Sequence, residues 1–177
     1  WTCSRACSSS SSGATTSTYT LTEAEVGKTL TVIASYTDGH GTAESKTSAA
    51  TSAVANLNDA PTGSVTITGT ATQGQTLTAA NTLADADGIG TISYQWQANG
   101  TAISGATGAT LVLGEAEVGK TITVIASYTD GHGALETATS AATSAVANVN
   151  DAPTGSVTIT GTATQGQTLT AANTLAD

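Results

Sequence analysis

Acidic and amide side chains recur in this sequence at spacings that could hold a hard cation. Three short motifs carry them: "EAE" at 23–25 and 115–117, "NDAP" at 58–61 and 150–153, and "DADG" at 85–88. Carboxylate, amide and backbone carbonyl oxygens are the ligands that Ca²⁺ takes, about six to eight at a time. Whether these oxygens meet depends on the elements that position them.

A second motif suggests different chemistry. Residues 114–121, "GEAEVGKT", match the G-x-x-x-x-G-K-[ST] pattern of a phosphate-binding loop. Such a loop needs a helix after it, whose N-terminus faces the phosphates. Here Lys120 is followed by "TITVIASYTDG", an alternating pattern typical of a strand, and Glu115 and Glu117 would place carboxylates in the cradle. We therefore predict no nucleotide partner and expect a turn that leads into a strand.

Composition favours an all-β protein. The 177 residues include no Phe and no Met, and most apolar residues alternate with Thr or Ser, which is the period of half-buried strands. The net charge of −9 argues against nucleic acid and anionic membrane surfaces, which require basic patches, and favours cations as partners. No run approaches the roughly 18 apolar residues of a membrane span, and any secretion signal is expected to lie outside this stretch.

The sequence is a tandem repeat. Residues 13–85 align with 105–177 at an offset of 92, and only eleven of the 73 pairs differ, which indicates an array of similar modules. Pro61 and Pro153 suit extended linkers that enter edge strands, so module boundaries are expected beside them. The predicted organisation is a partial module at 1–59, a complete β-sandwich module at 60–151 and a partial module at 152–177.

The complete module is predicted to be an immunoglobulin-like sandwich. About seven short strands at this spacing, separated by turn signals, are typical of that fold, and Trp96 is the expected central aromatic of its core. The Ala-rich end of the last segment could equally form an exposed helical turn. The expected strands are 63–69, 75–80, 91–98, 109–113, 120–128 and 134–148.

Sandwich topology brings the acidic motifs together. The start of the first strand ("NDAP"), the loop with "DADG" at 85–88 and the loop with "DGH" at 130–132 should share one pole, while "EAE" lies at the opposite pole and faces the next module. Each junction then collects oxygens from both neighbours and is predicted to bind Ca²⁺, whereas zinc would require His or Cys. The first acidic set is Glu23, Glu25, Asn56, Asn58, Asp59, Asp85 and Asp87, with Asp130 as a weaker candidate; the second acidic set is Glu115, Glu117, Asn148, Asn150, Asp151 and Asp177.

These motifs resemble those of a known family. "N-x-N-D-A-P" at 56–61 is similar to the calcium-binding linker of cadherins, "LADADGIGTISYQW" at 83–96 to their D-x-D loop, and 21–39 to their acidic turn and following strand. The array as a whole resembles the cadherin-like or immunoglobulin-like repeats of giant bacterial, calcium-dependent, type I-secreted surface adhesins. The resemblance implies extracellular extender modules that calcium makes rigid. Asn56 and Ala60 depart from the cadherin linker.

Other interpretations stay open for single motifs. "DG" is a common turn dipeptide, and for Asp38 and Asp130 the plain turn is the favoured interpretation. His40 and His132 are expected to be solvent-facing loop residues, and no Ser, Cys or acid recurs with them as a triad, so the protein is predicted not to be an enzyme. The alternative function is a carbohydrate- or protein-binding module of a secreted protein.

Identical copies of the chain are the expected partners, together with neighbouring modules. Trp1 matches the strand tryptophan of a module, and 152–177 match the first strands of one. The half-module at one end of a molecule could therefore complete the half-module of the next by strand addition, which would give a head-to-tail filament.

Overall fold

The protein is built from antiparallel β-strands. The computed structural model describes residues 2–7 and 18–177, with side chains described from Thr18 onward. Regular structure in these residues is strand, apart from two short 3₁₀ turns, η1 (Glu23–Glu25) and η2 (Glu115–Glu117). The all-β prediction is confirmed, whereas Trp1 lies outside the described residues. No helix in these ranges has both the length and the apolar character needed to cross a membrane.

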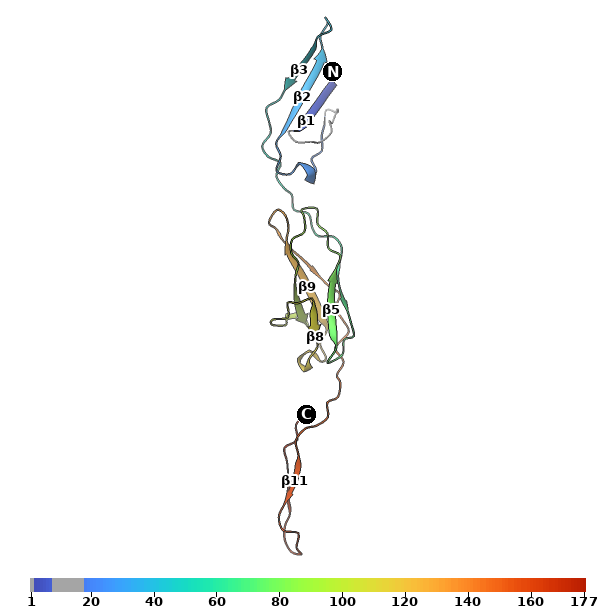
Figure 1. Ribbon diagram of the computed structural model, residues 1–177, viewed down its shortest axis with the longest axis vertical. Helices are drawn as coiled ribbons and strands as arrows, with labels where there is room; N and C mark the ends of the chain where they lie inside the picture. The colour runs from blue at the N-terminus through green and yellow to red at the C-terminus, as the bar shows by residue number, and fades with distance from the viewer. Residues whose placement is uncertain (1, 8–17) are drawn as a thin grey trace. The chain divides into compact units, whose positions relative to one another are not determined.

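Strand pairing forms four sheets among the described residues (Figure 1). One sheet has the order β1–β2–β3, from Thr2–Cys7, Leu30–Thr37 and Ala43–Thr47. The next has the order β4–β5–β8, from Val65–Thr68, Thr76–Asn81 and Thr110–Val112. The largest has the order β10–β9–β6–β7, from Leu135–Thr139, Ile122–Thr129, Ser93–Ala98 and Thr101–Ala102. The last is a ribbon of β11 (Val157–Thr160) and β12 (Thr170–Asn173).

The chain divides into two compact units. The first unit comprises residues 1–65, 81–94 and 125–139, and the second comprises 66–80, 95–124 and 140–177. The first unit contains the β1–β2–β3 sheet and all residues of the first acidic set. The second contains most of the buried apolar side chains and all residues of the second acidic set.

The core of the second unit follows from the two-residue period of its strands. On β9, Ile122 and Val124 are fully buried, whereas the alternate Thr123 is half-buried. Trp96 on β6 is also fully buried, as predicted, and its indole Nε1 donates a hydrogen bond of 2.9 Å to the carbonyl of Gly108. This bond satisfies the one polar atom that the ring carries into the core.

The last predicted strand, 134–148, is shorter than expected and is not helical. Strand β10 ends at Thr139, because the Ser140 hydroxyl then accepts the Val124 amide at 3.0 Å, and the Thr143 hydroxyl accepts the Ile122 amide at 3.0 Å. These side chains take the place of backbone carbonyls in the ladder, which interrupts regular pairing.

A two-residue hairpin joins β6 to β7, a short strand that the sequence did not predict. Asn99 has φ of 48° and Gly100 has φ of 78°, which is the left-handed geometry that an Asn-Gly hairpin turn requires. The Asn99 carboxamide oxygen also accepts the Thr121 amide at 2.9 Å. The segment 114–121 leads into strand β9 rather than a helix, as expected.

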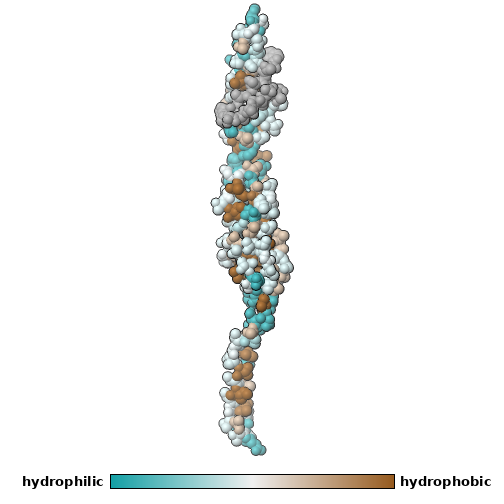
Figure 2. Space-filling model, turned by 45° about the vertical axis from the view of Figure 1, so that its right-hand side comes forward, coloured by the Kyte–Doolittle hydropathy of each residue, from teal (hydrophilic) through white to brown (hydrophobic). Residues whose placement is uncertain are grey.

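The β11–β12 ribbon exposes side chains whose repeat counterparts are buried. Leu169 is 50% exposed, while its counterpart Leu77 on β5 is 0% exposed. Val157 and Ile159 on β11 are likewise exposed, and Figure 2 shows hydrophobic residues at the surface of this ribbon. The same apolar sequence thus forms a core in one copy and a bare face in the other.

Replacement of these matched leucines by alanine should have very different effects. Leu77→Ala should lower the free energy of unfolding by about 2–5 kcal/mol, since it opens a cavity in a closed core. Leu169→Ala should change it by less than about 0.5 kcal/mol. Urea unfolding followed by Trp96 fluorescence, with Trp1 replaced by Phe, measures both. Equal losses would contradict the exposure of the ribbon.

Candidate metal centre

Three loops of the first unit meet at Asp87. The Asp59 amide of the linker donates to Asp87 Oδ2 at 2.7 Å, and the Gly131 amide of the 129–134 loop donates to the Asp87 carbonyl at 3.0 Å. A Cβ on Gly131 would lie 2.5 Å from that carbonyl oxygen, so this close approach requires glycine. The linker, the 83–90 loop and the 129–134 loop therefore share one pole, as the sequence predicted.

Asp85 and Asp87 have different surroundings. Asp85 Oδ1 accepts the Asp87 amide at 2.9 Å, and Oδ2 accepts the Tyr128 hydroxyl at 2.5 Å. Burial raises the pKa of Tyr128, and its hydrogen bond to Asp85 raises this pKa further. Asp87 is only 4% exposed, and its Oδ1 is buried without a hydrogen-bond partner among the described residues. A buried carboxylate oxygen in this state requires an explanation.

The "DGHG" segments are capped turns. Asp130 Oδ1 accepts the amides of His132 and Ala134, both at 2.8 Å, while its buried Oδ2 has no partner in the described part of the chain. Asp38 accepts the equivalent amides of His40 and Thr42 at 2.9 and 2.8 Å. The Thr42 amide first, and then the His40 amide, lower the pKa of Asp38. This geometry supports the plain-turn interpretation of Asp38.

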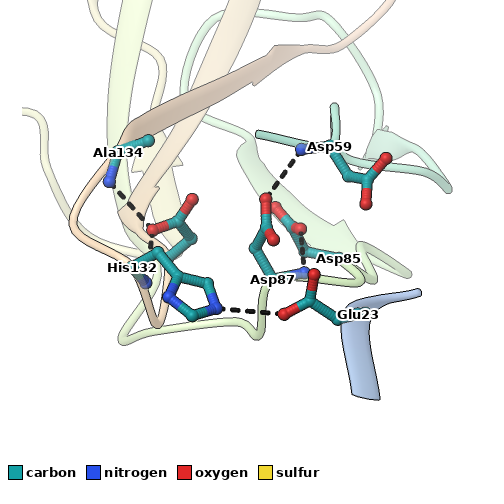
Figure 3. A network of polar contacts seen from close by, with 7 residues as sticks. Glu23, Asp59, Asp85, Asp87, His132 and Ala134 are labelled. Atoms are coloured by element: carbon teal, nitrogen blue, oxygen red, sulfur yellow. Dashed lines mark hydrogen bonds and ion pairs between the residues drawn. The ribbon is translucent and has the colours of Figure 1, made fainter. Parts of the chain in front are cut away.

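His132 is the residue that sequence reasoning missed. Its Nε2 lies 3.0 Å from Glu23 Oε1, although the ring was expected to face only solvent (Figure 3). One ligand atom from each of Glu23, Asp87 and His132 lies within 4.8 Å of the others. The predicted topology already placed "EAE" of one module against the loops of the next. The recurrence of "DGH" in those loops was the sequence signal that could have indicated a histidine beside "EAE".

The two glutamates of each "EAE" motif divide their roles. Glu25 is 3% exposed and accepts the Thr22 amide at 2.9 Å, the Thr22 hydroxyl at 2.8 Å and the Tyr19 hydroxyl at 2.8 Å. Glu117 accepts the Gly114 amide at 2.9 Å in the same way. Both residues cap their own 3₁₀ turns, so the first acid of each motif, Glu23 or Glu115, is the one directed outward.

The linker residues of the first acidic set point in several directions. Asn56 Oδ1 is buried and unpartnered within residues 18–177. The side-chain nitrogen Nδ2 of Asn58 donates a hydrogen bond to Glu136 Oε1 at 2.7 Å. Figure 3 shows the Asp59 carboxylate turned away from Asp87, even though its backbone amide binds that residue.

The second acidic set lines a pocket in the second unit. The pocket has a volume of about 350 Å³. Gln73 contacts two of the lining residues: its Nε2 lies 3.4 Å from Asp151 Oδ2, and its Oε1 accepts the Val149 amide at 3.0 Å. Its lining comprises Glu115, Asn148, Val149, Asn150, Asp151 and Asp177, so Glu117 is the one member of the set that does not contribute.

Comparison with known proteins identifies no relative. No protein-family model, curated protein or solved structure matches the chain at a significant level.

The Glu25 cap should make stability depend on pH. The Thr22 amide first, then the Tyr19 and Thr22 hydroxyls, lower the pKa of Glu25 from 4.5. A lowered carboxyl pKa contributes stability above the unfolded-state value, and this contribution is lost as pH falls through the folded-state value. Glu25→Gln should therefore destabilise the protein at neutral pH and have progressively less effect below 4.5.

Thermal melts of both proteins from about pH 7 to about pH 3 measure this difference. Glu44→Gln on exposed β3 is the control and should shift melting little throughout. A constant gap between the Glu25→Gln and unmodified melts would contradict a charge-dependent cap.

Proposed function

We propose that this chain is a run of extender modules from an extracellular bacterial adhesin or fibre, in which calcium stiffens the junctions between modules. The modules are tandem immunoglobulin-like or cadherin-like sandwiches with the 92-residue period of the sequence. Their role is mechanical rather than enzymatic. The all-β architecture and the repeated acidic junction motifs support this proposal.

The observation that carries the proposal is the carboxylate of Asp87. It is 4% exposed, and its Oδ1 has no hydrogen-bond partner within the described residues, although Asp85 and Glu23 lie in the same cluster. Removing a carboxylate from water is costly unless charge or hydrogen bonds compensate. A cation at this position would supply that compensation.

The residues present fit a hard cation. Glu23, Asn56, Asp85 and Asp87 would hold calcium at the first junction, together with backbone carbonyls, because calcium takes oxygen ligands in flexible geometry. Calcium would supply positive charge that neutralises the carboxylates. The pocket lined by Glu115, Asn148, Asn150, Asp151 and Asp177 offers the same oxygen types at the second junction.

Stiffening follows from electrostatics. Like charges at a junction repel each other. The chain has 13 acidic side chains and only four Lys or Arg side chains to offset them, for a net charge of −9. An ion that binds oxygens from both sides of a junction would replace this repulsion with attraction. The junction would then resist bending, which is the property that an extender requires.

Neighbouring modules are the proposed partners. The exposed apolar face of β11–β12 repeats the buried face of β4–β5. A further half-module, in the same chain or an identical one, would cover it by strand addition.

Calcium should raise the melting temperature of the chain, and Asp87→Asn should abolish the increase. An ion that binds only the folded state at about 100 times its Kd adds about 2.7 kcal/mol. This corresponds to an increase of roughly 10 °C for a domain of about 100 residues. Differential scanning calorimetry with calcium and then with a chelator measures the change.

Asp38→Asn is the matched control, because Asp38 caps an exposed turn and is not a member of the Glu23, Asp87 and His132 group. This variant should melt earlier in both buffers yet keep the full calcium increment. Identical melting of the unmodified protein in calcium and in chelator would overturn the proposal.

A further inference from the structure

We propose that Glu23, Asp87 and His132 form a site for a divalent transition-metal ion of the zinc class. This inference rests on the proposed function in one respect, namely that the acidic junction takes cations. It adds a second class of ion, which the imidazole selects, to the calcium proposed for the same junction.

The ligand types suit such an ion. Zinc binds imidazole nitrogen and carboxylate oxygen, and sites with three protein ligands keep a further position for water. Calcium takes oxygen ligands and does not favour the ring nitrogen of His132 as a ligand. The imidazole therefore separates the two classes of ion, although Glu23 and Asp87 could serve both.

The distances are close to those of a bound state. Two ligands of a tetrahedral zinc ion, each about 2.0–2.1 Å from the metal, lie roughly 3.4 Å apart. Glu23 Oε1 and His132 Nε2 are separated by 3.0 Å, and the three ligand atoms lie within 4.8 Å of one another. The widest pair would need to close by at most about 1.4 Å, which side-chain rotation can supply.

Asp87 provides an independent indication of a ligand. Its side chain is more than nine-tenths buried, with 4% of the residue exposed, and Oδ1 lacks any hydrogen-bond partner among the described residues. Figure 3 shows its carboxylate between Asp59 and the Glu23–His132 pair. An oxygen that simply stabilised a loop would be expected to accept an N–H or O–H donor.

Backbone contacts hold each ligand in place. Glu23 stands on η1, which Glu25 caps. His132 follows the turn whose amides Asp130 accepts, and Asp87 is held by the Asp59 amide at 2.7 Å. Such supporting hydrogen bonds orient ligands before a metal arrives.

Binding would replace the present Glu23–His132 contact. The neutral imidazole must offer the lone pair of Nε2 to the ion, so its proton resides on Nδ1, and any additional proton is released to solvent. No bond other than this contact has to break.

The chain contains its own matched control. His40 occupies the equivalent position in the preceding "DGHG" segment and is exposed, and it is not part of the three-residue group. His40 and His132 are the two histidines of the sequence, so their ring signals can be followed separately. Cys3 and Cys7 would compete for metal, so both are replaced by Ser in the test protein.

The experiment is a Co²⁺ titration of the full chain, with Co²⁺ as a spectroscopic substitute for zinc. Visible absorption measures affinity, and NMR follows broadening of the two histidine rings. The ring signals of His132 should broaden first, at about one Co²⁺ per chain. Added Zn²⁺ should displace Co²⁺ and restore the sharp signals. His132→Gln should weaken binding about tenfold or more, whereas His40→Gln should leave it within about twofold.

Glu23→Gln should weaken binding in the same way, and Glu115→Gln should have little effect, since Glu115 belongs to the other acidic set. Equal broadening of both rings, or equal affinity of His132→Gln and His40→Gln, would overturn the inference. If His132→Gln fails to fold, the ring broadening in the parent protein decides the question alone.

A calcium arm separates the two proposals. Calcium-dependent melting without selective Co²⁺ binding at His132 would overturn this inference and leave the calcium junction standing. Selective Co²⁺ binding at His132 without any calcium effect on melting would overturn the calcium junction and leave this inference standing. Competition between calcium and Co²⁺ would support both, because Glu23 and Asp87 would belong to both sites.

Discussion

The need to compensate buried carboxylate oxygens governs the acidic junction of this protein. Asp87 and Asp130 are only 4% and 7% exposed, and each keeps one oxygen without a hydrogen-bond partner within the described ranges. Backbone amides satisfy the other oxygen of each residue and hold the loops together. The same contacts that order the pole therefore leave negative charge facing inward, where a cation is the natural counterpart.

The acidic residues of the chain have two roles: some cap local turns, and others keep oxygens that can bind an ion. Residue type alone does not tell the two apart. Glu25, Glu117 and Asp38 accept nearby amides or hydroxyls and so stabilise local turns. Glu23 and Asp87 retain oxygens that can bind an ion. An acidic count alone would overstate the number of ligands, because the carboxylates of Glu25, Glu117 and Asp38 are already engaged in the fold.

Repetition makes the influence of surroundings unusually clear. Leu77 and Leu169 occur in identical local sequence, yet one is fully buried and the other half-exposed. His40 and His132 follow the same "DG" turn, yet of the two only His132 forms an ion-pair or hydrogen-bond contact with a glutamate in the described residues. Identical sequence produces similar strands and turns, whereas strand length, burial and pairing depend on what lies beside them.

Local chemistry explains what the sequence determined by itself. Alternation with Thr and Ser specified strands, Asn-Gly specified the turn after β6, and Trp96 was recognisable as a core residue because few large side chains exist to fill that core. The meeting of three loops at one pole also followed from strand order. Tertiary structure alone decided that β10 ends at Thr139 and that His132 reaches Glu23. These outcomes depend on contacts between residues up to 109 positions apart, which no short-range pattern records.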